Sequence, residues 1–131
     1  MLNAIERKFM TPSFHLSLGV KSIEASIKFF TGALNAKVLH SDPSGYVNLD
    51  LYGTQITLKQ SQDISLEFSH FHFGVNLSLS DFDRLSEKIL RDSREFVTML
   101  PEVLDAGTKM ERKKMYLSCP TGYSIELKGY K

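Results

Sequence analysis

The amino-acid sequence predicts an α+β fold made of two tandem βαβββ modules, whose strands form a curved mixed sheet around a shared cleft. Two segments, 14–20 and 70–79, alternate apolar and polar residues as half-buried strands do, and each contains an aromatic–His–apolar triplet. The pattern Gly-x-x-Ile-x-Leu-Lys also occurs twice, at 53–59 and at 122–128. The chain therefore contains an internal repeat, in which one motif occurs twice.

The first module, over about residues 13–60, has the order strand, helix, strand and hairpin. Ser22 is a residue type that caps helix N-termini, and apolar residues then recur at helical spacing up to Leu34. Turn-forming residues follow at 42–45 and at Gly53-Thr54. The strands of this module are expected at 13–20, 37–40, 47–51 and 55–59.

The second module, over about residues 70–130, opens with the strand at 70–79. Ser80 and Asp83 resemble a capping box, and the helix that they begin has an apolar stripe. Its later strands are expected at 96–100, where Pro101 ends the strand, at 114–118 and at 123–128. Residues 1–12 are expected to form a leading arm and 61–69 a polar linker.

Size and composition favour a single domain over residues 1–131. Lys plus Arg less Asp plus Glu is 16 − 15, a net charge of +1, which gives no general attraction to nucleic acid or to anionic membranes. The lone cysteine, Cys119, fits a reducing compartment. With no apolar leader or spanning segment, the expected location is cytoplasmic.

Three titratable side chains are expected on the polar faces of strands: His15, His72 and Glu126. The repeat matches the two histidines with each other, and it matches Glu126 with Thr57. If the modules pair about a pseudo-two-fold axis, these faces line the shared cleft. Two imidazoles and one carboxylate that leave other positions open are typical of non-haem Fe(II) enzymes and also suit Mn(II). We predict a divalent metal site, with Fe(II) first and Mn(II) or Zn(II) as alternatives, that polarises substrate oxygens.

Each of these side chains also has a structural interpretation. A strand histidine is commonly a surface or hydrogen-bonded residue, and Glu126 could pair with Lys128 or with a cross-strand neighbour. His70 is expected on the strand face of His72, as an outer-shell base, an alternative ligand or a solvated residue. The basic run Arg112-Lys113-Lys114 is interpreted as a solvated strand edge rather than as an RNA contact.

The duplicated layout, with Phe14-His15, Phe71-His72 and the stretch 120–126, resembles the vicinal oxygen chelate superfamily. This superfamily includes glyoxalase I, extradiol dioxygenases, and fosfomycin- and bleomycin-resistance proteins. The resemblance runs from about residue 13 to 130, and His72-Phe73-Gly74-Val75 looks like small bacterial proteins described as predicted extradiol-type dioxygenases. It implies that His15, His72 and Glu126 are the metal ligands.

The C-terminal part is similar to the extradiol dioxygenase signature, in which Tyr116 leads to Pro120-Thr121-Gly122 and the ligand Glu126. The resemblance implies that Tyr116 hydrogen-bonds a metal-bound substrate oxygen, and a cross-strand aromatic is the other interpretation. Positions 107–109 lack the histidine of that signature, so His70 is the candidate for an acid/base role.

Three functions fit these residues. The first is a metal-dependent, dioxygenase-like oxidoreductase that chelates vicinal oxygens of a small substrate and couples it to O2. The second is a glyoxalase-like isomerase or lyase, ranked lower because Thr57 stands where a fourth ligand is usual. The third is a drug- or metabolite-binding resistance module without chemistry. The resemblance also implies a homodimer that acts on a small molecule.

Overall fold

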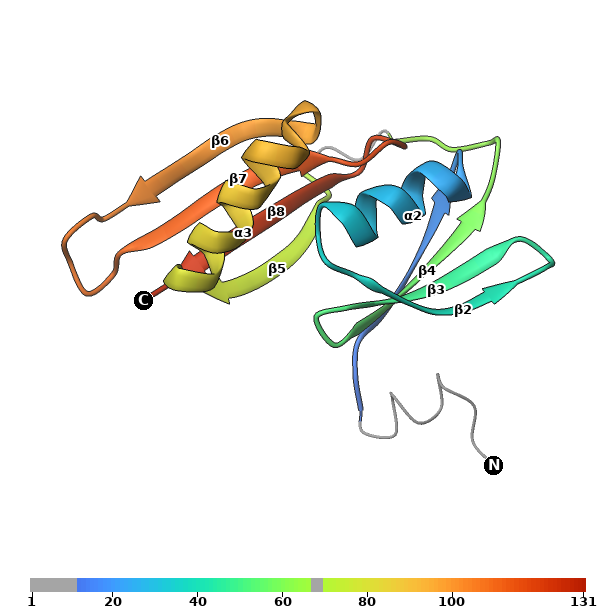
Figure 1. Cartoon of the computed structure of the whole chain (residues 1–131), viewed down its shortest axis with the longest axis horizontal. Helices are drawn as coiled ribbons and strands as arrows, with labels where there is room; N and C mark the ends of the chain where they lie inside the picture. The colour runs from blue at the N-terminus through green and yellow to red at the C-terminus, as the bar shows by residue number, and fades with distance from the viewer. Residues whose placement is uncertain (1–11, 67–69) are drawn as a thin grey trace. The chain divides into compact units, whose positions relative to one another are not determined.

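The chain forms two compact units, 1–65 and 66–131 (Figure 1). The computed structural model describes residues 12–66 and 70–131. Most of the expected leading arm and the end of the expected linker lie outside these residues. Each unit contains one four-stranded mixed sheet and one longer helix, so the prediction of an α+β fold with two βαβββ modules is confirmed.

The first unit has the strand order β1-β4-β3-β2, in which β1 is parallel to β4 and the other pairs are antiparallel. Ser22 caps the helix as predicted, because its hydroxyl accepts a hydrogen bond from the amide of Ala25 at 3.1 Å. Tyr52 and Gly53 have φ of 49° and 89°, the backbone of a tight hairpin turn between β3 and β4. The elements are β1 His15–Val20, α2 Ile23–Gly32, β2 Lys37–Asp42, β3 Tyr46–Leu51 and β4 Thr54–Gln60.

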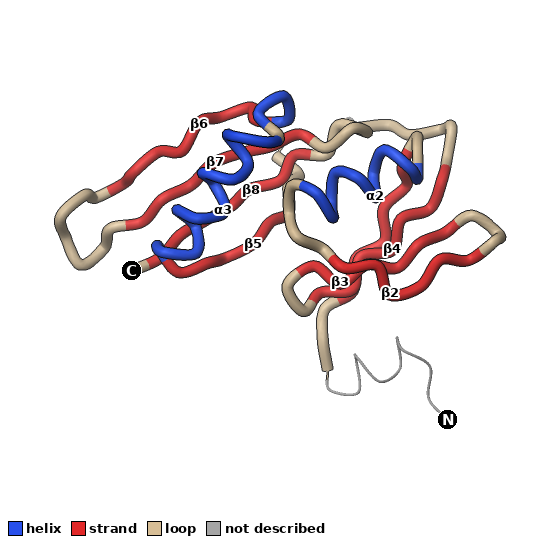
Figure 2. The backbone as a smooth tube through the Cα atoms, in the orientation of Figure 1, coloured by secondary structure: helices blue, strands red, loops and turns tan. Residues whose placement is uncertain are grey.

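The second unit has the equivalent order β5-β8-β7-β6, again with its first strand parallel to its last. Helix α3 lies along one face of this sheet, where Phe82, Leu85 and Ile89 are buried (Figures 1 and 2). The opposite face carries the candidate site. The elements are β5 Phe73–Ser78, α3 Leu79–Asp92, the 3-10 turn η1 Arg94–Phe96, β6 Val97–Leu104, β7 Arg112–Ser118 and β8 Ser124–Tyr130.

The strand register shows that the two modules are equivalent residue by residue. Thr57 lies opposite Ser17 in the first sheet, and Glu126 lies opposite Gly74 in the second. His15 precedes Ser17 by two residues at the start of β1, and His72 precedes Gly74 by two residues just before β5. The repeat inferred from sequence is therefore present in the hydrogen-bonded pairing of the strands.

Several boundaries differ from the sequence prediction, and three of the differences have a clear structural reason. The strand expected at 70–79 begins only at Phe73, because His70 has a φ of 77° that breaks the extended backbone. Helix α3 begins at Leu79, with Ser78 instead of Ser80 as its cap, because the Ser78 hydroxyl accepts from the amide of Asp81 at 3.1 Å. Strand β6 continues through Pro101, which is tolerated because β6 is an edge strand with an irregular register there.

The basic run at 112–114 lies on β7, which has β8 on one side and β6 on the other. The interpretation of this run as a strand edge is therefore wrong. In the described ranges 12–66 and 70–131, no helix is long and apolar enough to span a bilayer.

Candidate functional site

The face of the second sheet that is opposite α3 presents polar side chains in cross-strand rows. In one row Tyr116 of β7 lies opposite Glu126 of β8, which lies opposite Gly74 of β5. In the next row Lys114 lies opposite Lys128. These rows are about 6.7 Å apart, because same-face residues are two positions apart along a strand.

Glu126 is the centre of this arrangement. Its side chain is only 8% exposed, and its Oε1 atom lies 3.8 Å from His72 Nε2 and 3.3 Å from Lys128 Nζ. Tyr116 adds a hydrogen bond to the same carboxylate. The pairing with Lys128 expected from sequence is present, together with the closeness to His72 on which the metal prediction depends.

Gly74 allows β5 to approach β8 at this point. A Cβ atom at position 74 would lie 1.8 Å from the backbone oxygen of Glu126, a distance that no side chain can occupy. The close approach brings His72, two residues earlier, to the side of the Glu126 carboxylate. The sequence analysis did not assign this role to Gly74, although a glycine within a strand is a recognised sign of close backbone approach.

His72 is oriented by contacts on its other side. Its Nδ1 atom lies 3.1 Å from the backbone oxygen of His70, and since a carbonyl only accepts, Nδ1 carries the proton. This leaves Nε2 facing Glu126. The His72 ring also packs edge-on against Tyr116, with 5.8 Å between ring centroids. A histidine whose second nitrogen donates to a backbone carbonyl is the usual arrangement for a metal ligand.

The site keeps Glu126 ionised. Burial raises the pKa of Glu126, but hydrogen bonds from Tyr116 and Lys128 and the charges of Lys128 and His72 outweigh it, so the pKa lies below its ordinary value of 4.5. The hydrogen bond to Glu126 raises the pKa of the Tyr116 hydroxyl, and burial and the carboxylate charge add to that effect. The same carboxylate raises the pKa of Lys128.

His72 and Glu126 fit as two ligands of one divalent ion. Two ligand atoms about 2.1 Å from a common tetrahedral ion lie about 3.4 Å apart, so the 3.8 Å between Nε2 and Oε1 needs only a small closure. Within either unit, the described residues contain no group of three His, Cys, Asp or Glu that could hold a metal. The second unit by itself therefore supplies two of the three predicted ligands.

The other residues singled out from the sequence are His15, Thr57 and His70. His15 begins β1 in the first unit and is exposed. Thr57, which matches Glu126 in the repeat, donates a hydrogen bond to Asn48 at 2.5 Å. His70 lies in a turn before β5, so the expectation that it shares a strand face with His72 is wrong, and its acid/base role stays a prediction.

A pocket of about 240 Å3 opens beside the pair, lined by His72, Phe73, Gly74, Asn76, Glu126 and Lys128. Sequence reasoning missed Asn76 as a lining residue, although its even position on β5 placed it on the face of His72. The pocket gives a small molecule access to the carboxylate and the imidazole together.

The fold of the chain is similar to that of several solved structures. A glyoxalase/bleomycin resistance protein/dioxygenase from Alicyclobacillus acidocaldarius superposes with a TM-score of 0.75 at 22% identity, over 92% of each chain. The chain has the vicinal oxygen chelate fold. The same fold occurs in the fosfomycin resistance protein FosX from Listeria monocytogenes, solved with Mn(II) and sulfate, with a TM-score of 0.68 and 16% identity over 92% of this chain and 93% of that one.

Sequence comparison with curated proteins also gives a relative. The metallothiol transferase FosB of Staphylococcus saprophyticus is 27% identical over 119 residues, covering 86% of this chain and 73% of that protein. No family model matches the chain. The resemblance stated from the sequence is thus confirmed for the fold, while the comparisons do not favour the extradiol dioxygenase branch.

Proposed function

We propose that this protein is a metal-dependent enzyme that binds two neighbouring oxygens of a small substrate. The observation that carries the proposal is the pair formed by His72 Nε2 and Glu126 Oε1, 3.8 Å apart, beside an open pocket. We assign the third ligand position to His15, which the repeat matches with His72.

A bound divalent ion would supply a Lewis acid that polarises substrate oxygens. Glu126 is kept ionised for this role by Tyr116 and Lys128. Tyr116 lies opposite Glu126, and we assign its hydroxyl to donate to a substrate oxygen instead of to Glu126 when the substrate is bound. The Mn(II) in the Listeria FosX structure supports Mn(II) beside Fe(II) as the ion, with Zn(II) as a further candidate.

For the reaction, the signature around Tyr116 supports coupling of the substrate to O2, as in an extradiol-type dioxygenase. The likeness to a metallothiol transferase supports a second candidate, transfer of a thiol to the substrate. The missing histidine at 107–109 weighs against ring cleavage, because that chemistry would then need His70 as its acid/base group. We therefore place thiol transfer beside O2 chemistry as a reaction to be tested.

The first experiment measures metal binding directly. Metal-free protein is titrated with Mn(II), and with Fe(II) under anaerobic conditions, by isothermal titration calorimetry. We expect His15→Ala, His72→Ala and Glu126→Gln each to weaken binding by about 10- to 100-fold or more. His40→Ala is the matched control, since His40 pairs with Asp42 at 3.7 Å near the β2–β3 turn. No metal uptake, or equal losses in the control, would refute the proposal.

The second experiment separates the reactions. Oxygen uptake is followed with a panel of catechols, and thiol consumption is followed with low-molecular-weight thiols and fosfomycin. Activity in only one assay assigns the reaction class. Tight binding of a test compound that is unchanged in His72→Ala would instead favour a binding module without chemistry. We also propose a homodimer, which light scattering of the purified protein tests, and a cytoplasmic location, which cell fractionation tests.

A further inference from the structure

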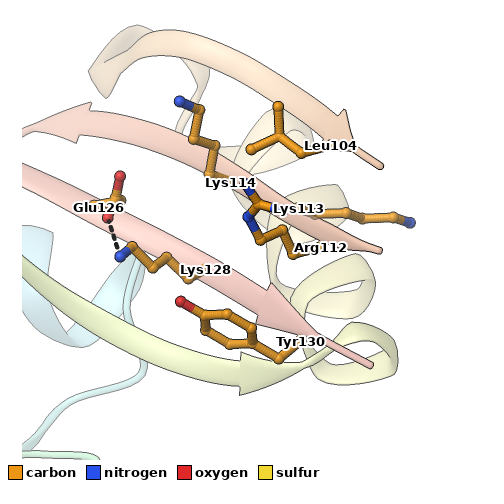
Figure 3. A pocket seen from close by; sticks show the side chains of 7 residues that line it. All are labelled: Leu104, Arg112, Lys113, Lys114, Glu126, Lys128 and Tyr130. Carbon is orange, nitrogen blue, oxygen red and sulfur yellow. Dashed lines mark ion pairs between the residues drawn. The ribbon is translucent and has the colours of Figure 1, made fainter. Parts of the chain in front are cut away.

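A group of three cationic side chains lies next to Glu126 on the same sheet face, and one of them, Lys128, also pairs with Glu126. Lys114 and Arg112 belong to β7, and Lys128 belongs to β8. They line a pocket of about 210 Å3 together with Leu104, Lys113, Glu126 and Tyr130 (Figure 3). This pocket shares Glu126 and Lys128 with the pocket beside His72.

The register of β7 and β8 makes this group unusual. Lys114 lies directly opposite Lys128 in the antiparallel pair, and like charges at directly opposed positions destabilise a sheet. In the next row, Arg112 lies opposite Tyr130, whose hydroxyl interacts with Lys128. Figure 3 shows these side chains gathered on one face of the two strands. An anion held among them would remove the repulsion.

The acidic partners of Lys114 and Arg112 leave these two cations available. Lys114 lies 4.0 Å from Glu102, and Arg112 pairs with Asp105, two acids whose side chains are 52% and 53% exposed. Exposed ion pairs of this kind contribute little free energy, so a ligand can compete for both cations. Lys113 is different, because its Nζ lies 2.7 Å from Asp83 of α3, away from the group.

We infer that Arg112, Lys114 and Lys128 form a subsite for an oxyanion on the substrate, so that the substrate is a small organic acid. Arginine provides a planar fork for two oxygens, and each lysine adds a charge-assisted hydrogen bond. The row of Lys114 and Lys128 is about 6.7 Å along the face from the row of Glu126, which is within the span of a small molecule. The acid group is a carboxylate or a phosphoryl group.

The test titrates inorganic phosphate and, separately, acetate into metal-free protein at low ionic strength, with backbone amide NMR shifts of β7 and β8 as the readout. We expect saturable shifts, and about tenfold weaker binding in Lys114→Gln and in Arg112→Gln. Arg91→Gln is the control, because Arg91 lies on α3, pairs with Asp92 and lines neither pocket, and its affinity should equal that of the wild type.

Each outcome of this titration decides the inference. Tighter binding of phosphate assigns a phosphoryl group, and tighter binding of acetate assigns a carboxylate. The absence of saturable shifts with both anions, or an equal loss in Arg91→Gln, overturns the subsite. Because Lys114 and Arg112 are tested separately, misfolding of one variant leaves the other to decide.

The inference rests on the proposed function only where it assigns the anion to the substrate. A second measurement distinguishes a failure of the anion subsite from a failure of the metal site. With Mn(II) present, Lys128 would exchange its partner Glu126 for the anion, so phosphate should bind more tightly, and by linkage Mn(II) should bind more tightly with phosphate. Lys128→Gln should reduce this coupling, and full coupling in that variant would overturn the role of Lys128. If Mn(II) does not bind while phosphate does, the metal proposal fails and the subsite stands.

Discussion

Gly74 and Glu126 lie directly opposite each other in the parallel pairing of β5 with β8, with no space for a side chain at position 74. This contact sets how near β5 comes to the buried carboxylate. Since His72 is two residues from Gly74 on the same segment, the contact also sets the position of the imidazole. The glycine therefore belongs to the site although it carries no functional group.

Replacement of Gly74 by Ala should damage both the sheet and the site. The added methyl group would overlap the backbone oxygen of Glu126, so we expect the free energy of unfolding to fall by about 1–3 kcal/mol. Gly32→Ala is the control, because no heavy atom lies within 4 Å of a Cβ there and its effect should be small. Urea denaturation of both variants measures the difference, and equal stabilities would contradict the close approach.

The lowered pKa of Glu126 predicts a pH-dependent contribution to stability. A carboxyl group whose pKa is lower in the folded state stabilises the protein above its unfolded pKa and loses that contribution as the pH falls through its folded pKa. Wild type should therefore exceed Glu126→Gln in stability at neutral pH, and the difference should shrink below about pH 4.5. Denaturation of metal-free protein between neutral and acidic pH tests this. A difference independent of pH would show that Glu126 is not held in its charged form.

Tyr116 is predicted to lower the pKa of Glu126 through its hydrogen bond. Tyr116→Phe removes the hydroxyl and keeps the ring beside His72, so the pKa of Glu126 should rise. The titration of the Glu126 side-chain carboxyl carbon by NMR measures this change. Tyr46→Phe, which changes a tyrosine beside His40 in the first unit, should leave the pKa of Glu126 unchanged. An unchanged Glu126 titration in Tyr116→Phe would refute the hydrogen bond.

The N-cap of α3, where β5 ends and the helix begins, can be tested by substitution. Ser78→Ala should cost about 1 kcal/mol of unfolding free energy, because its hydroxyl accepts the amide of Asp81. Ser80→Ala should cost less, since Ser80 lies inside the helix. Thermal or urea unfolding compares the two. A larger loss in Ser80→Ala would restore the cap expected from sequence.

Periodicity and the internal repeat were sufficient to predict the element order, because alternation and helical spacing are local properties of the chain. The ends of the elements depended on single backbone conformations that periodicity does not report, as the positive φ of His70 shows. The pairing of Glu126 with Lys128 was also local, since the two residues share one strand face.

The closeness of His72 to Glu126 was expected only through the repeat, because residues 54 positions apart meet through strand register. Register depends on packing along whole strands, here including the approach at Gly74. The opposition of Lys114 and Lys128 was not predicted for the same reason, since the position of β7 beside β8 was not known from the sequence.

The matching registers of the two sheets also bear on how the copies diverged. Thr57 and Asn48 occupy the places in the first sheet that Glu126 and Tyr116 occupy in the second, so one copy keeps a neutral hydrogen-bonded pair where the other has an acid and a phenol. After duplication, the second module thus specialised for reactivity, while the first module kept the same strand pairing with neutral side chains. Transplanting the acid and the phenol into positions 57 and 48 would then be a rational route to a chain with two reactive halves.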